Sequence, residues 1–205
     1  LDRLVEDQIA KGVSALIAVG TTGEPATMTW DEHLAVIRRV VEKADHRVPV
    51  IAGTGSNSTS EAVYAAKHSK EFGADAQLVV TPYYNKTSQA GLVAHFNAIA
   101  DAATLPVIVY NVPARTGLNI GPEAMAKICE HENVIAVKEA SPDVAQAMEK
   151  IRLCGDMVDF YCGNDDLIVP MMSVGFKGVI SVLSNLLPAE TSRMTTLALE
   201  GNYKE

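Results

Sequence analysis

The sequence has 205 residues, of which 48% are hydrophobic and 20% are charged, and its formal net charge is −8. This profile is that of an ordinary globular domain with enough apolar material for a sizeable core. The negative balance argues against a nucleic-acid surface, and no apolar run approaches the roughly 20 residues that cross a bilayer.

The first residues already follow a helical pattern. Apolar residues recur at helical spacing from Leu1 to Ile9, and Gly12 is typical of the residue at which such a helix ends. The sequence has no initiator Met and no readable targeting signal, and its last residues, GNYKE, look like the end of a helix cut short. We therefore expect it to be a piece of a longer chain.

Seven short segments rich in Val, Ile and Ala are predicted strands. They lie at 14–20, 49–55, 76–82, 106–113, 133–140, 158–165 and 178–182. Each is almost continuously apolar instead of alternating, which is the pattern of a strand buried on both faces.

Amphipathic stretches separate these strands. Residues 31–44 and 88–103 each place apolar side chains along one helical face. Two helix starts match the capping box, one from Thr29 to Glu32 and one from Ser58 to Glu61. The repeated order of strand, loop and helix predicts a parallel sheet with crossover helices.

Such a sheet is either a closed (β/α)8 TIM barrel or an open doubly wound sheet. Polar residues follow the carboxyl ends of successive strands, as at Thr21, Thr81, Tyr110, Lys138 and Asn164. A barrel gathers these ends around one mouth, whereas an open sheet spreads them along an edge. We therefore predict a single barrel domain over 1–205, with its first strand lying ahead of Leu1.

Lys138 lies where the apolar run from Val134 to Val137 ends, with Glu139 beside it. A lysine at a barrel mouth loses hydration of its charged form, so its pKa falls and the free amine can attack a carbonyl to form a Schiff base. The alternative is a lysine that reaches solvent or pairs with Glu139, and the position of Lys138 taken alone favours this alternative. The other polar residues expected at the mouth favour the chemical role.

Three of the other strand ends carry groups suited to an acidic substrate. Tyr110 supplies a phenol, and Arg115 supplies a guanidinium that can bind a carboxylate, although a solvated loop arginine is the commoner case. Thr21 and Thr22 lie in a glycine-bracketed turn that can present N–H groups to an anion or serve only as a connection. The adjacent phenols at 83–84 can point in different directions and serve different sites.

Other motifs are weak. The segment GTGSNS at 53–58 lacks the full dinucleotide fingerprint, and the five histidines show no ligand spacing, so we expect no metal. Asp165 and Asp166 are better interpreted as charges at a helix start. The three cysteines form no CxxC pair, which favours a reducing compartment and indicates no disulfide framework.

Five motifs, taken together, resemble one enzyme family. In order they are GTTGE (20–24), TPYYN (81–85), YNVPARTG (110–117), AVKEAS (136–141) and GVISV (178–182). In this order and spacing they resemble the pyruvate-dependent class I aldolase/lyase family, over essentially the whole chain. The resemblance implies a TIM barrel, of which this sequence lacks the first strand and the C-terminal helices.

The resemblance also implies roles for single residues. Lys138 would form the Schiff base with pyruvate, and Tyr110 would donate protons. Thr21 and Tyr84 would complete a relay with this phenol, Tyr84 reaching in from a neighbouring subunit. The residues implied in substrate binding are Thr22, Arg115, Ile180 and Gly163, with Arg115 receiving the carboxylate of the second substrate.

The reaction implied is condensation of pyruvate with L-aspartate 4-semialdehyde to 4-hydroxy-tetrahydrodipicolinate, in diaminopimelate and lysine biosynthesis. It needs no cofactor, because the lysine activates pyruvate. The implied enzyme is a cytoplasmic dimer or tetramer that binds neither nucleic acid nor membranes. The alternatives are another pyruvate aldolase, such as an N-acetylneuraminate lyase or a sugar-acid aldolase, and a catalytically silent barrel fragment.

Some members of this family are inhibited by lysine at a dimer interface. The residues here that match that site are Ala26, Trp30, His33, Asn57, Glu61 and Tyr83. We expect feedback inhibition by L-lysine as a secondary property.

Overall fold

A computed structural model describes residues 1–204, and all seven predicted strands form in it, each shorter than its apolar segment. The strands are β1 (Leu16–Ala18), β2 (Val50–Gly53), β3 (Ala76–Val80), β4 (Val107–Asn111), β5 (Val134–Glu139), β6 (Asp159–Cys162) and β7 (Gly178–Val179). The strands are shorter because the last residues of each apolar segment belong to the loops at the carboxyl ends of the strands.

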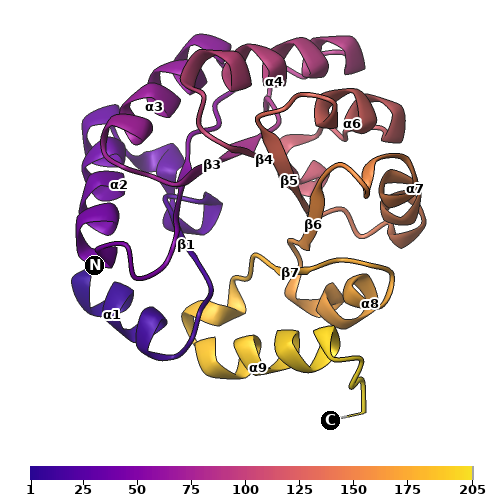
Figure 1. Cartoon of the computed structure of the whole chain (residues 1–205). Coiled ribbons are helices and arrows are strands. Elements are labelled where there is room, and N and C mark those ends of the chain that lie inside the picture. The colour runs from indigo at the N-terminus through magenta and orange to yellow at the C-terminus, as the bar shows by residue number, and fades with distance from the viewer. Residues whose placement is uncertain (205) are drawn as a thin grey trace.

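The strands form one parallel sheet in the sequential order β1 to β7. A doubly wound sheet would reverse its strand order at a switch point, so this order favours the barrel architecture. The sheet curls around an interior with the helices outside it (Figure 1). Within the described residues β1 and β7 are not paired with each other, so the curl is an open arc of a barrel.

Helices cover the outer face of the arc. The longer ones are α1 (Asp2–Ala10), α2 (Trp30–Ala44), α3 (Thr59–Glu71), α4 (Gln89–Ala103), α6 (Pro122–Cys129), α7 (Val144–Cys154) and α9 (Pro188–Leu199). The short ones are α5 (Pro113–Thr116) and α8 (Ile168–Ser173), with the 3-10 turns η1 (Thr21–Gly23), η2 (Pro25–Thr27), η3 (Asp165–Leu167) and η4 (Leu183–Asn185). No helix in residues 1–204 is long and apolar enough to span a membrane.

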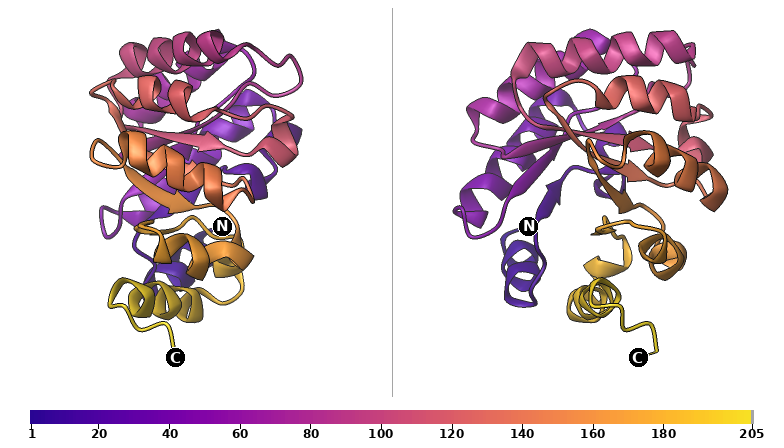
Figure 2. Two further views of the ribbon diagram at one scale, coloured as in Figure 1. Left: turned by 90° about the vertical axis from the view of Figure 1, so that its right-hand side faces the viewer. Right: turned by 45° about the vertical axis from the view of Figure 1, so that its right-hand side comes forward.

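The two ends of the arc lie near each other. In both views α1 and α9 flank the edge strands on the same side of the molecule (Figures 1 and 2). One hydrogen bond bridges this side, from Gln8 Nε2 to the carbonyl oxygen of Ser184 at 2.9 Å.

The strands are buried on both faces, as their composition predicts. Val79, Val109 and Val137 point outward into the helix layer and are fully buried there. Leu78 and Ile108 point inward, into a smaller apolar cluster that fills the barrel interior. Because successive side chains alternate between faces, the residues that end β4 and β5 are also divided between the mouth and the helix layer.

The two predicted capping boxes have different outcomes. The one at α2 is confirmed: the Thr29 hydroxyl accepts from the Glu32 amide at 3.3 Å, and the Glu32 carboxylate accepts from the Thr29 amide at 2.9 Å. The one at α3 is wrong, because Glu61 accepts a hydrogen bond from the Ser56 hydroxyl at 2.7 Å and does not reach Ser58. Ser58 still precedes the helix, but its side chain caps nothing.

Candidate active site at the barrel mouth

Lys138 lies one residue before the end of β5, with its side chain on the inner face of the sheet. It is buried, with 8% of its surface exposed, next to the interior cluster that contains Tyr110 and Ala140. The alternative interpretation of a solvent-exposed lysine is therefore wrong. Pairing with Glu139 is also ruled out, since the Glu139 carboxylate lies on the other side of the strand and binds Lys150.

Burial sets the protonation of Lys138. It lowers the pKa of the amine from 10.5 to about 8, because the protonated form loses its hydration. The negative charge of Asp165 opposes this shift in pKa, and the positive charge of Arg115 adds to it. The amine is thus partly free near neutral pH, which is the form that attacks a carbonyl carbon.

Tyr110 faces this amine from the neighbouring strand. Tyr110 and Lys138 are register partners between β4 and β5, and the Lys138 Nζ atom lies 4.3 Å from the centre of the phenol ring. Burial raises the pKa of Tyr110, while a side-chain interaction with Thr21 and the charge of Arg115 lower it. The phenol is therefore protonated at neutral pH and can donate a proton to a group bound at Lys138.

Gly163 and Ile180 close the side of the site formed by β6 and β7. A Cβ atom on Gly163 would lie 2.7 Å from the Cβ of Ala140 and 3.1 Å from the Cε of Lys138, so only glycine leaves room for this lysine. The backbone amide of Ile180 donates to the Cys162 carbonyl at 2.8 Å, and its side chain packs against the interior cluster. Both residues therefore border the interior cluster next to Lys138, and their part in substrate binding stays a prediction.

Two predicted site residues form no hydrogen bond, ion pair or ring contact with Lys138 or Tyr110 within the described part of the chain. Thr22 lies beside Thr21 in η1 and is exposed. Tyr84 is 91% exposed and has a φ of 71°, a strained value for a bulky side chain, and no hydrogen bond within residues 1–204 joins it to Thr21 or Tyr110. Within one chain the predicted relay therefore includes Tyr110 and Thr21 alone.

No hydrogen bond, ion pair or ring contact within residues 1–204 joins the six residues predicted to bind lysine to Lys138. The rings of Trp30 and His33 pack at 5.1 Å, and His33 is buried, with its Nε2 atom 2.7 Å from the Gly53 carbonyl oxygen. Tyr83 is 38% exposed. Ala26, Asn57, Glu61 and Tyr83 have no hydrogen bond or ring contact with the Trp30–His33 pair in the described part of the chain.

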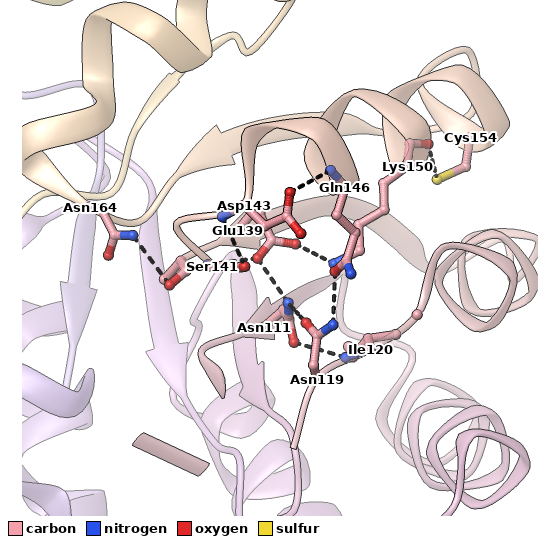
Figure 3. Close-up of polar contacts among 12 residues, drawn as sticks. Asn111, Asn119, Ile120, Glu139, Ser141, Asp143, Gln146, Lys150, Cys154 and Asn164 are labelled. Carbon is pink, nitrogen blue, oxygen red and sulfur yellow. Dashed lines mark hydrogen bonds and ion pairs between the residues drawn. The ribbon is translucent and has the colours of Figure 1, made fainter. Parts of the chain in front are cut away.

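Sequence reasoning missed a polar network directly behind the site (Figure 3). Glu139 accepts from Lys150 Nζ at 2.7 Å, and both side chains are buried, at 1% and 0% exposure. Glu139 also accepts from Asn111 Nδ2 at 2.8 Å. The period-2 alternation could have placed Asn111 and Glu139 on the outer face, but nothing in the sequence marks Lys150 as their partner, since it lies in another element.

No group of three or more His, Cys, Asp or Glu residues within the described range is placed to hold a metal ion. The carboxylate of Asp165 is instead used in the loop after β7, where it accepts from the Ser181 hydroxyl at 2.5 Å and the Leu183 amide at 2.8 Å. The interpretation of Asp165 as only a helix-start charge is thus incomplete, because it begins η3 and also holds this loop.

Comparison with known proteins gives one consistent result. The model of the dihydrodipicolinate synthetase family matches residues 1–205. The 4-hydroxy-tetrahydrodipicolinate synthase of Geobacter metallireducens is 50% identical over 100% of this chain and 71% of its own length. The synthase of Caldicellulosiruptor saccharolyticus is 53% identical over 100% of this chain and 69% of its own length.

Solved structures agree with these relatives. Dihydrodipicolinate synthase from Aquifex aeolicus superposes with a TM-score of 0.97 at 43% identity, covering 99% of this chain and 70% of that one. The Acinetobacter baumannii enzyme, complexed with pyruvate, has a TM-score of 0.95 at 40% identity over 99% and 69% of the two chains. The Cyanidioschyzon merolae enzyme, with lysine bound, has a TM-score of 0.94 at 40% identity over 99% and 71%.

Proposed function

The chain belongs to the dihydrodipicolinate synthetase family, and we propose that it condenses pyruvate with L-aspartate 4-semialdehyde to form 4-hydroxy-tetrahydrodipicolinate. This is a lyase reaction of diaminopimelate and lysine biosynthesis, and relatives about 50% identical over the whole chain are named for it. The observation in this chain that carries the proposal is the buried amine of Lys138, 4.3 Å from the Tyr110 ring centre.

The reaction begins at Lys138. Its free amine attacks the ketone carbon of pyruvate, and loss of water gives a protonated imine. The imine withdraws electrons, so the pyruvate methyl group loses a proton and becomes an enamine carbon. That carbon attacks the aldehyde of the second substrate, and the amine of this substrate then displaces Lys138 as the ring closes. The lysine is released unchanged.

Tyr110 and Thr21 are the proposed proton carriers. Tyr110 delivers a proton to the oxygen that leaves as water and later to the new alkoxide, and Thr21 relays protons to it. The raised pKa of Tyr110 and its side-chain interaction with Thr21 support these roles. Each transfer needs a protonated phenol close to the oxygen atoms of the intermediate bound at Lys138, and the register of β4 and β5, which pairs Tyr110 with Lys138, supports this.

The substrate carboxylates are assigned to the rim. Thr22 binds the carboxylate of pyruvate, and Ile180 and Gly163 shape the side of its pocket. Arg115 binds the carboxylate of the semialdehyde, and its electrostatic effect on both Lys138 and Tyr110 supports a place at the mouth. A pyruvate complex of the Acinetobacter baumannii relative is consistent with this choice of first substrate.

The role proposed for Tyr84 requires more than one subunit. We propose that it completes the relay from a neighbouring subunit of a homodimer or homotetramer. Its 91% exposure and strained backbone support this, since strain persists at positions that function requires. The three cysteines are free and buried, which supports a cytoplasmic location.

L-lysine is the proposed feedback inhibitor. The lysine-bound structure of the Cyanidioschyzon merolae relative supports this, and Ala26, Trp30, His33, Asn57, Glu61 and Tyr83 are the proposed binding residues. Inhibition assays with increasing L-lysine test the proposal. Full activity at millimolar lysine would contradict it.

Reductive trapping tests the chemistry. Treating the full chain with pyruvate and borohydride should fix a reduced pyruvate adduct on Lys138, located by peptide mass spectrometry. Absence of the adduct would contradict any Schiff-base function and would leave a silent barrel. Turnover with L-aspartate 4-semialdehyde but not N-acetylmannosamine then separates the proposed synthase from an N-acetylneuraminate lyase. Arg115→Ala should impair that turnover while leaving trapping intact.

A further inference from the structure

A buried carboxylate lies directly next to the proposed nucleophile in the sequence. Glu139 follows Lys138 on β5, and its side chain is directed to the opposite face of the strand, under α7. Three donors hold it: Lys150 Nζ at 2.7 Å on one oxygen, and Asn111 Nδ2 and the Ser141 amide, each at 2.8 Å, on the other. All its hydrogen bonds therefore come from inside the protein.

The partners of Glu139 fix the strand ends on which the site is built. Asn111 is the register partner of Glu139, just as Tyr110 is that of Lys138. Asn111 also donates to Asn119 Oδ1 at 2.8 Å and accepts from the Ile120 amide at 3.0 Å, so its amide group is fully used. The network thus joins β4, β5 and α7 one residue behind the reacting side chains (Figure 3).

Lys150 supplies the only charge that offsets Glu139 among these donors. A buried carboxylate without a cation would stabilise a positive charge nearby, because interactions between charges are stronger in a medium of low dielectric constant than in water. Lys138 is one residue away, and its protonated form would gain. The charged and titratable groups around Lys138 are Tyr110 on β4, Tyr161 on β6, Arg115 on α5 and Asp165 in η3. The Cys162 thiol is close to Lys138 along β6 but lies on the outer face, beside Glu139.

We propose that Lys150 is a positioning residue for the reaction: its ammonium group holds Glu139 behind β5 and cancels the carboxylate charge, so that Glu139 does not stabilise protonated Lys138. The inference rests on the proposed function, in which Lys138 forms the Schiff base. It assigns a role to a charged pair that is buried deeper than the site itself and touches no substrate.

The test is the pH dependence of adduct formation. The rate of reductive trapping with pyruvate and cyanoborohydride is measured from pH 6 to pH 10 for the wild type, Lys150→Met, Glu139→Gln and the double variant. Lys150→Met should shift the midpoint of the rate–pH profile to higher pH. Trapping at pH 7 should fall about threefold, which corresponds to a rise of about half a unit in the pKa of Lys138, since the free-amine fraction changes tenfold for each unit of pKa. Glu139→Gln should shift it to lower pH, and the double variant should restore the wild-type midpoint.

The controls separate charge from folding. Lys127→Met removes an exposed lysine of the neighbouring helix α6 and should leave the midpoint unchanged. Circular dichroism identifies any variant that does not fold; if Lys150→Met is one, Glu139→Gln and the double variant still decide the case. Identical midpoints in every folded variant would overturn the proposal. If the wild type itself forms no adduct, it is the proposed function that fails.

Discussion

Lys138 and Lys150 are both buried lysines, but they lie on opposite faces of β5 and have opposite surroundings. Lys150 meets the Glu139 carboxylate at 2.7 Å, whereas Lys138 meets the face of the Tyr110 ring and has no ion pair within the described residues. The pair of Lys150 and Glu139 joins α7 to β5. A buried lysine without a carboxylate partner has a lowered pKa, which suits the nucleophile role proposed for Lys138. The two lysines therefore differ most in whether a carboxylate faces them.

The largest expected effect comes from replacing each lysine by methionine and measuring activity. Lys138→Met removes the nucleophile, so synthase turnover should fall at least a thousandfold and no pyruvate adduct should form. Lys150→Met keeps the nucleophile, so it should still be trapped on Lys138. Steady-state kinetics and mass spectrometry of the two variants check this, and an adduct in Lys138→Met would refute the assignment.

For the free energy of unfolding, Lys150→Met should be the more damaging of the two substitutions. Lys150→Met leaves the Glu139 carboxylate buried without its cation, and breaking a buried pair in this way costs about 3–5 kcal/mol of unfolding free energy. Replacing both partners, as Glu139→Gln with Lys150→Met, should recover most of the loss, because no charge then remains buried and the Gln oxygen can still accept from Asn111 and Ser141. Urea denaturation measures both changes. A Lys150→Met variant as stable as the wild type would show that the unpaired carboxylate carries no such cost.

Lys138→Met should instead stabilise the protein at pH 7. Burial lowers the pKa of Lys138 from 10.5 to about 8, so below pH 8 the folded state contains a poorly solvated charge that costs about 3 kcal/mol. Between pH 8 and 10.5 the unfolded chain binds more protons than the folded one, so wild-type stability rises with pH. The advantage of the variant should therefore vanish by about pH 10.5 in urea melts. An advantage that is independent of pH would mean that desolvation is not its cause.

The smallest effect is expected at Gly163. Gly163→Ala places a methyl group 3.1 Å from the Cε of Lys138 and 2.7 Å from the Cβ of Ala140, which displaces the lysine slightly. We expect about tenfold slower adduct formation and a loss of about 1–3 kcal/mol of unfolding free energy, since the Ala140 Cβ can yield only if the backbone shifts. Gly23→Ala, where a Cβ would meet nothing within 4 Å, is the matched control. Equal trapping rates in both would remove Gly163 from the site.

The sequence determined the strands and their parallel arrangement, because continuous apolar runs and the repeated order of strand, loop and helix are readable along the chain. It also placed Lys138 at a strand end, since the apolar run stops there. Thr29 and Glu32 were predicted correctly as a capping box for the same reason, since both partners lie within one turn. The similar pattern at Ser58 failed because Glu61 found another partner, Ser56, in the preceding loop. A pattern permits a local contact, but competing contacts in three dimensions decide it.

Only the tertiary structure decided which residue pairs with Glu139. In the sequence it lies beside Lys138, and an ion pair between the two is a natural expectation. The pleat of β5 directs these neighbours to opposite faces, and the packing of α7 brings Lys150 to the carboxylate from 11 residues away. Which of two lysines is paired and which is free depends on the packing of a helix against a strand, and no local pattern in the chain encodes that.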